Sequence, residues 1–137
     1  MNFQNTGYTI KQVQQQIHIA MEDALRPLSL NISQYNVLKN LEALSPTTGA
    51  ELARKAFVTP QTMHTILMNM EKKGFIKRSI LSGNSKSFAV FTTTTGGYAL
   101  KDAEKALSTV FNNGDTALTS KEHSELEYLL QKLSTSL

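Results

Sequence analysis

The sequence predicts a mainly α-helical fold with one small β-hairpin, and three observations lead to it. First, a capped helix that stops at Gly74 is followed at once by two short apolar strands around the polar residues 82–85. Second, apolar residues spaced three and four apart mark further helices on both sides of this unit. Third, the stretch from Arg54 to Lys86 holds seven Lys or Arg against one acidic residue, a net charge of +6, whereas the rest of the chain sums to −3. The layout is that of a winged helix, and the charge indicates nucleic acid as its partner.

The remaining composition limits the class of protein. With 137 residues, 40% hydrophobic and 18% charged, the chain has the make-up of one globular domain. No apolar run reaches the roughly 20 residues that a membrane-spanning helix needs, and we see no secretory signal, so we expect a cytoplasmic protein without a membrane partner. The absence of cysteine excludes disulfides, thiolate metal sites and cysteine-based redox sensing.

Two helices are predicted before the positive segment. Apolar residues at steps of three and four over residues 8–28 predict an amphipathic helix, with Pro27 near its end. Ser33 is then expected to cap a second helix, which buries its apolar face and breaks at residues 45–47.

A helix-turn-helix unit follows. Thr48 and Glu51 have the spacing of a capping box for a short third helix that ends at about Ala56. After a tight turn, Thr59 is expected to cap a fourth helix with Pro60 at its first position, where the missing N–H costs nothing.

The hairpin strands and two more helices complete the chain. Residues 76–80 and 87–91 are predicted as strands. A fifth helix is predicted from Gly96, with an interruption at residues 112–115. A second capping-box spacing, Thr119 with Glu122, opens the last helix.

The first, fifth and sixth helices carry broad apolar stripes that one small winged-helix core cannot cover. A twofold pair with a second copy buries such stripes, so we expect a homodimer. The predicted fold class is therefore mainly α with a small β-hairpin wing, a winged helix-turn-helix core flanked by N- and C-terminal dimerisation helices. The expected divisions are residues 1–30 for the N-terminal dimerisation helix, 31–95 for the DNA-binding lobe and 96–137 for the C-terminal dimerisation helices.

Several segments carry a resemblance to a known family. Its most specific part is Met-Glu-Lys-Lys-Gly-Phe-Ile-Lys-Arg at residues 70–78, and further matches fall at residues 32–38, 51–53, 62–63, 93 and 96. Over nearly its whole length the chain resembles the MarR family of bacterial transcription regulators. The resemblance implies a dimeric repressor on a pseudo-palindromic operator, released by a small aromatic or anionic effector. It carries over no ligand residues: His18, Met21 and Tyr35 lie in roughly the right elements, but core packing explains each of them better.

The tip of the wing departs from the family pattern. The family usually has Asp-x-Arg there, with the arginine in the minor groove, whereas this chain has Asn84, Ser85 and Lys86. Lysine keeps the charge but lacks the planar donor fork of arginine. We therefore expect a wing that contributes charge more than A·T discrimination.

The candidate DNA-binding residues lie on the fourth helix, its surroundings and the hairpin. They are Thr48, Thr59, Pro60, Gln61, Thr62, His64, Thr65, Lys72, Lys73, Arg78, Asn84, Ser85 and Lys86. Gln61 has the groups to pair with adenine, and Thr62 or Thr65 to meet a thymine methyl group or a phosphate. The alternative for the helix is an exposed polar face, and for the basic residues a solvated charge run. Arg78 has its own alternative, a half-buried ion pair to the helix-turn-helix unit.

No pattern in the sequence supports an enzyme. The three histidines, His18, His64 and His123, lack ligand spacing, and helix-surface pairs with Glu22 and Glu127 explain two of them better than a metal does. We therefore expect no catalytic residues, no metal and no cofactor. Two rival functions stay open: a winged-helix module that binds protein, which the charge disfavours, and an activator or an antagonist of another regulator.

Overall fold

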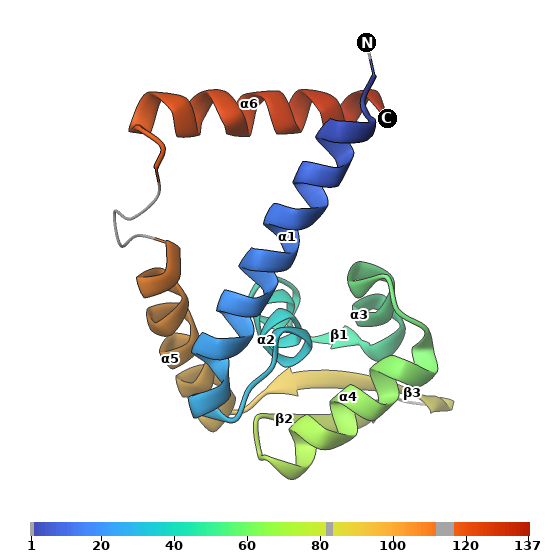
Figure 1. Cartoon of the computed structure of the whole chain (residues 1–137). Coiled ribbons are helices and arrows are strands. Elements are labelled where there is room, and N and C mark those ends of the chain that lie inside the picture. Colours follow the sequence, from blue (N-terminus) through green and yellow to red (C-terminus); the bar gives the residue numbers. More distant parts are fainter. Residues whose placement is uncertain (1, 82–83, 112–116) are drawn as a thin grey trace.

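The computed structural model describes residues 2–81, 84–111 and 117–137, with the side chains at 81, 84–87 and 111 left out. Its elements, in chain order, are α1 (Gln4–Leu25), η1 (Arg26–Leu28), α2 (Ile32–Leu44), β1 (Thr47–Thr48), α3 (Gly49–Ala56), α4 (Pro60–Lys72), β2 (Ile76–Leu81), β3 (Asn84–Thr92), α5 (Thr94–Phe111) and α6 (Ser120–Ser136). Figure 1 shows α2, α3, α4 and the small sheet gathered at one end, with α1 and α6 extending away from them. The predicted fold class is confirmed.

The helix-turn-helix unit and the sheet form a lobe with one continuous apolar core. The inner faces of α2, α3 and α4 meet the sheet and α5, and the largest fully buried side chains include Leu38, Leu41, Leu52, Met63, Met70, Ile76 and Val90. The sheet is antiparallel in the order β1-β3-β2. Its edge strand β1, in which Thr47 pairs with Val90, was not predicted, because two residues are too few to show a strand period.

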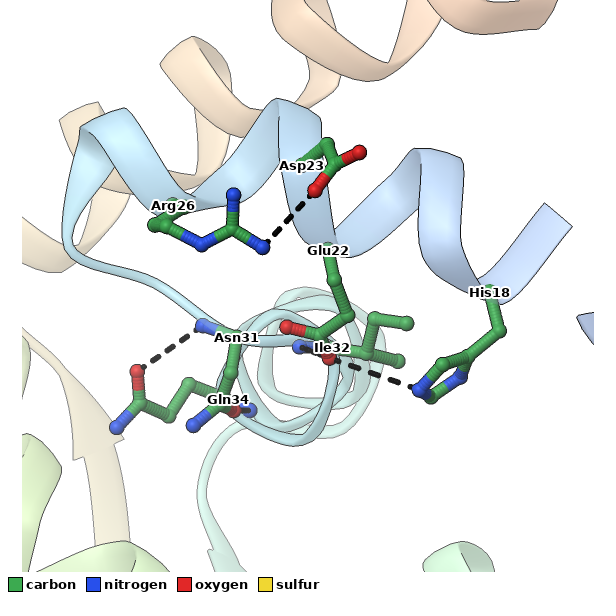
Figure 2. A network of polar contacts seen from close by, with 7 residues as sticks. All are labelled: His18, Glu22, Asp23, Arg26, Asn31, Ile32 and Gln34. Atoms are coloured by element: carbon green, nitrogen blue, oxygen red, sulfur yellow. Dashed lines mark hydrogen bonds and ion pairs between the residues drawn. The ribbon is translucent and has the colours of Figure 1, made fainter. Parts of the chain in front are cut away.

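The start of α2 differs from the prediction. Asn31, not Ser33, caps this helix: its side chain accepts the Gln34 N–H at 2.9 Å, and the Gln34 side chain accepts the Asn31 N–H at 3.3 Å. Only a cap at Asn31 allows this reciprocal box. Figure 2 shows a third partner, because Glu22 of α1 accepts the N–H of Ile32 at 3.2 Å. A carboxylate from the long first helix therefore helps to start the lobe's first helix.

The helix-turn-helix unit follows the predicted signals with one difference. Thr48 caps α3 by accepting the Glu51 N–H at 3.2 Å, but the predicted capping box is only half formed, because the Glu51 side chain pairs with Arg54. The turn places Phe57 in the left-handed region at φ 55°. Thr59 then caps α4 ahead of Pro60, as predicted.

The helix α5 is seated on the corner between α4 and β2. It begins at Thr94, two residues before the predicted start, because Thr93 is the residue whose Oγ1 accepts the Gly96 N–H, at 3.0 Å. The same Oγ1 donates to the carbonyl of Gly74. A Cβ at Gly96 would lie 2.0 Å from the Phe75 carbonyl oxygen, so only glycine permits this approach.

The helices α1 and α6 bury little within one chain, whereas α5, contrary to the expectation, buries its apolar stripe in the core of the lobe through Leu100, Ala103 and Leu107. In the described part of the chain α6 has no buried residue, and in α1 only Leu25 is buried. The predicted capping box of α6 is present, with Thr119 accepting the Glu122 N–H and Glu122 accepting the Thr119 N–H. The predicted interruption at residues 112–115 lies outside the described residues. Both chain ends lie where α1 and α6 meet, far from the lobe (Figure 1).

Candidate nucleic-acid interface

The helix α4 has one buried side and one polar, exposed side. Met63, Leu67 and Met70 anchor it to the core. The predicted contact residues Gln61, Thr62, His64 and Thr65 are all exposed. An anchored helix with a free polar face near its capped start is what a helix-turn-helix protein lays into a major groove.

Hydrogen bonds between residues three and four apart order this polar face. The Thr59 hydroxyl accepts the Thr62 N–H at 3.1 Å and lies 3.0 Å from the Thr62 hydroxyl. The Thr65 hydroxyl donates to the Gln61 carbonyl at 3.3 Å. These bonds fix the threonine rotamers, so their methyl groups have defined directions.

Arg78, on β2, is held by three contacts. Its Nη2 lies 3.0 Å from a Glu71 carboxylate oxygen, its Nη1 lies 3.3 Å from His64 Nδ1, and its guanidinium carbon lies 5.3 Å from the centre of the Phe88 ring. Only 15% of the Arg78 side chain is exposed. The hydrogen bond from Arg78 holds the pKa of the Glu71 carboxyl below its ordinary value. The sequence interpretation of Arg78 as an ion-pair partner of the helix-turn-helix unit is thus confirmed, whereas its Phe88 contact carried no local signal.

The two lysines at the end of α4 differ in their surroundings. Lys73 donates to the Ser29 carbonyl and, at 3.2 Å, to the Gln34 side chain, so it ties α4 to the start of α2. This second role was missed because Ser29 and Gln34 are distant in sequence. Lys72 is exposed in the last turn of α4. Phosphate contact by either lysine stays a prediction.

Thr48 and the wing flank the exposed face of α4. A shallow pocket of about 270 Å³ brings together Thr48, Pro60, His64, Arg78 and Phe88, from α4 and all three strands of the sheet, with Gly49 and Ala50 of α3 beside them. The predicted contacts of Asn84, Ser85 and Lys86 at the wing tip stay predictions, because these side chains lie outside the described residues. The structure therefore brings the residues of α3, α4 and β2 into one surface.

A second surface, which is apolar, lies on the long helices α1 and α6. A groove of about 920 Å³ runs between α1, α6 and the start of α2, and its apolar wall is formed by Ile10, Val13, Ile17, Met21, Ile32, Leu126, Leu129, Leu130 and Leu133. His18 also lines it, with its Nε2 4.0 Å from Glu22 (Figure 2). Tyr35 packs against the core of the lobe.

The residues of the described ranges form neither a metal-binding cluster nor a membrane-spanning helix. Among these residues no group of three or more His, Asp or Glu is placed to hold a metal ion. Within the same ranges no helix has the length and apolar character to cross a membrane.

The three-helix core, the small sheet and the exposed polar face of α4 define a winged helix-turn-helix protein. A comparison with family models matches residues 30–88 to the MarR family. The HTH-type transcriptional repressor Rv2887 of Mycobacterium tuberculosis is 30% identical over 129 residues, which cover 94% of this chain and 93% of the repressor. The chain therefore belongs to the MarR family of winged helix-turn-helix transcription regulators.

Solved structures agree with this assignment. Rv2887 in complex with DNA has a TM-score of 0.79 at 29% identity, covering 93% of this chain and 95% of that one. Rv2887 in complex with salicylic acid has a TM-score of 0.72 at 31% identity, covering 93% and 94%. A mutant MarR from E. coli with operator DNA reaches 0.83 at 24% identity, covering 96% and 94%, which supports the fold.

Proposed function

We propose that this protein is a dimeric transcription repressor that binds a pseudo-palindromic operator with the exposed face of α4 and releases it on binding a small effector. The observation that carries the proposal is the joint presence of the ordered polar face of α4 and the +6 charge of the segment around it. As a DNA-binding regulator the protein would act in the cytoplasm.

The proposed contacts divide by chemistry. Gln61, His64 and Thr65 are exposed on the first turns of α4, where side chains reach base edges. Thr48, Thr59 and Lys72 are proposed phosphate contacts, which position the protein without reading sequence. For Arg78 we propose a supporting role, since its side chain is only 15% exposed and both terminal nitrogens already contact Glu71 and His64.

The apolar groove supports the dimer. A contiguous apolar wall on α1 and α6 is left uncovered within one chain, and an exposed apolar groove of this kind is a candidate interaction surface. A second copy of the same helices supplies a matching apolar surface under twofold symmetry. Residues 1–30 and 96–137 are accordingly proposed as dimerisation helices around the DNA-binding lobe of residues 31–95. Two lobes related in this way would meet half-sites about one helical turn apart.

The effector proposal rests on the same region. The relative Rv2887 has been crystallised with salicylic acid, a small aromatic acid. In this chain, α1 touches the first turn of α2 through Glu22, so a ligand near that junction would move the lobe relative to the dimer helices. We propose an aromatic acid as the effector class.

Mobility shift at two salt concentrations, on the DNA upstream of the protein's own gene, tests the function. Because the basic segment displaces counterions from phosphates, affinity should fall at least tenfold between about 50 and 200 mM salt. Gln61→Ala should change base preference, whereas Lys72→Ala should weaken binding to all sequences alike. Binding that ignores salt, or wild-type behaviour of both variants, would refute the assigned DNA face.

A second candidate is an activator that uses the same DNA surface. Repression and activation differ in where the operator lies relative to the promoter, so a map of bound genomic fragments decides between them.

A further inference from the structure

The contact between His64 and Arg78 determines the tautomer of the histidine. The Nη1 atom of Arg78 lies 3.3 Å from Nδ1 of His64. A guanidinium has five N–H donors and no acceptor, and it stays protonated in proteins. Nδ1 must therefore accept this hydrogen bond through its lone pair. A neutral imidazole with a bare Nδ1 carries its proton on Nε2.

Arg78 imposes this choice because it is fixed by groups other than His64. Glu71 holds its Nη2 at 3.0 Å, and Phe88 supports the guanidinium plane from β3 at 5.3 Å. The backbone of Arg78 also pairs with Val90 in the sheet. With 15% of the side chain exposed, the arginine has little freedom to turn a different group towards the histidine.

The imidazole of His64 lies on the exposed polar face of α4. His64 is exposed on α4, between Gln61 and Thr65, which belong to the same polar face. With Nδ1 occupied by the arginine, Nε2–H is the one polar group of the ring left for a ligand. His64 thus offers a hydrogen-bond donor and no acceptor.

We propose that His64 is a specificity-determining residue that donates from Nε2 to a guanine in the operator, and that Arg78 is its positioning residue. This inference rests on the proposed DNA-binding function. In the major groove guanine presents two neighbouring acceptors, N7 and O6. Adenine places an N6 donor beside its N7, thymine sets a methyl group beside O4, and cytosine presents only a donor. A donor-only side chain therefore favours guanine most and rejects cytosine most.

The tautomer is measured first, in the protein without DNA. Nitrogen-15 NMR of the imidazole, at a pH where the ring is neutral, should show the Nε2–H form of His64 alone. The exposed His123 is an internal reference, because it lies on α6, away from the positive segment, and its imidazole makes no hydrogen bond or ion pair with the described residues. A Nδ1–H form of His64, or an averaged signal like that of a free imidazole, overturns the inference that Arg78 fixes the tautomer.

The Arg78→Lys variant tests whether Arg78 determines the tautomer of His64. Lysine keeps the positive charge for Glu71 but has no second planar donor to reach His64. The His64 signal should then move to an average of the two tautomers while the ion pair with Glu71 is kept. An unchanged Nε2–H signal in this variant overturns the role of Arg78.

Base reading is measured by selecting bound sequences from a random DNA pool with three variants of His64. His64→Leu should lose the guanine preference at one base pair of each half-site, with about a fivefold loss on the wild-type operator. His64→Gln should restore the preference, because Arg78 takes the amide oxygen and leaves the NH₂ outward. His64→Glu should shift the preference to cytosine, since a carboxylate only accepts.

The outcomes separate this inference from the proposed function. A wild-type protein that selects a specific operator, with the same base preferences in His64→Leu, overturns the reading by His64 and leaves the repressor function standing. A wild-type protein that selects no DNA overturns the proposed function itself. Preferences that follow donor or acceptor character across the three variants support the inference.

Discussion

The DNA-binding lobe and the arm, which is formed by the two helices α1 and α6, differ in how completely they bury their apolar side chains. In the lobe, apolar side chains of α2, α3, α4 and the sheet meet one another, and the largest of them are almost fully buried. In the arm, the apolar residues of α1 and α6 face an open groove, and 57% of Leu129 is exposed. The lobe is complete within one chain, whereas the arm leaves apolar surface uncovered.

This difference assigns separate tasks to the two regions. A complete lobe holds α4 rigidly, so that its polar face has fixed geometry for DNA. An incomplete arm gives the chain a reason to associate, because burying apolar surface yields roughly 25 cal/mol per Å². Two joints connect them: Glu22 of α1 accepts the Ile32 N–H at the start of α2, and Thr93 and Gly96 seat α5 against Gly74 and Phe75.

The largest expected effect comes from charging the arm. Leu130→Glu places a carboxylate in the apolar wall, and burying it unpaired in a dimer is prohibitive. The dimer should dissociate, and operator affinity in a mobility shift should fall more than 100-fold, because each chain then binds one half-site alone. Gln131→Glu is the matched control, since Gln131 is exposed and outside the groove wall. Equal affinities of the two variants would contradict the arm's role.

A smaller effect is expected at the second joint between the two regions. Gly96→Ala puts a Cβ 2.0 Å from the Phe75 carbonyl oxygen, so the backbone must shift. We expect a loss of about 3 kcal/mol in the free energy of unfolding, measured with urea. At Gly97 a Cβ meets nothing within 4 Å, so Gly97→Ala should stabilise the helix by about 0.5 kcal/mol. Two alanine variants of equal stability would show that the joint is not tight.

The two left-handed turns of the lobe should respond in opposite directions. Phe57 adopts φ 55° with its side chain 96% exposed, so Phe57→Gly relieves strain and loses no packing. Gly74 adopts φ 78°, and Gly74→Ala adds the same strain. Urea unfolding should show Gly74→Ala about 1 kcal/mol less stable than wild type, and Phe57→Gly slightly more stable. A destabilised Phe57→Gly would reveal a folding role for that side chain.

The smallest expected effect concerns acid. The pKa of the Glu71 carboxyl lies below its ordinary value of 4.5 in the folded protein, owing to Arg78. The stabilisation by this ion pair is therefore complete above that ordinary value and is lost as the pH falls through the lowered folded pKa. Because Glu71 is 40% exposed, the pair contributes only about 0.5 kcal/mol. Glu71→Gln should flatten that part of the acid-unfolding curve, and an unchanged curve would contradict the pairing.

The sequence predicted what depends on neighbours along the chain. The caps Thr59 and Thr119 were found because a cap bonds to a residue three positions on. The cap of α2 was misplaced by two residues because Asn31 and Ser33 both suit that position, and the partner Gln34 decides between them. The strand β1 and the Phe88 contact of Arg78 were missed because they depend on residues distant in sequence.

The candidate site divides in the same way. The exposed residues of α4 follow from helix periodicity around Met63 and Leu67. The contacts of Lys73 with Ser29 and of Arg78 with His64 arise only from the folded arrangement. Sequence therefore located the surface, and the structure distinguishes the side chains that support it from those that are free to bind.

The mass of the protein in solution tests the central claim most directly. Size-exclusion chromatography with light scattering, at micromolar concentration and without DNA, should give the mass of two chains, because only a second copy completes the arm. A single-chain mass that persists as the concentration rises would show that no second copy covers the groove between α1 and α6. The proposal that a dimer binds two half-sites of the operator would then be wrong.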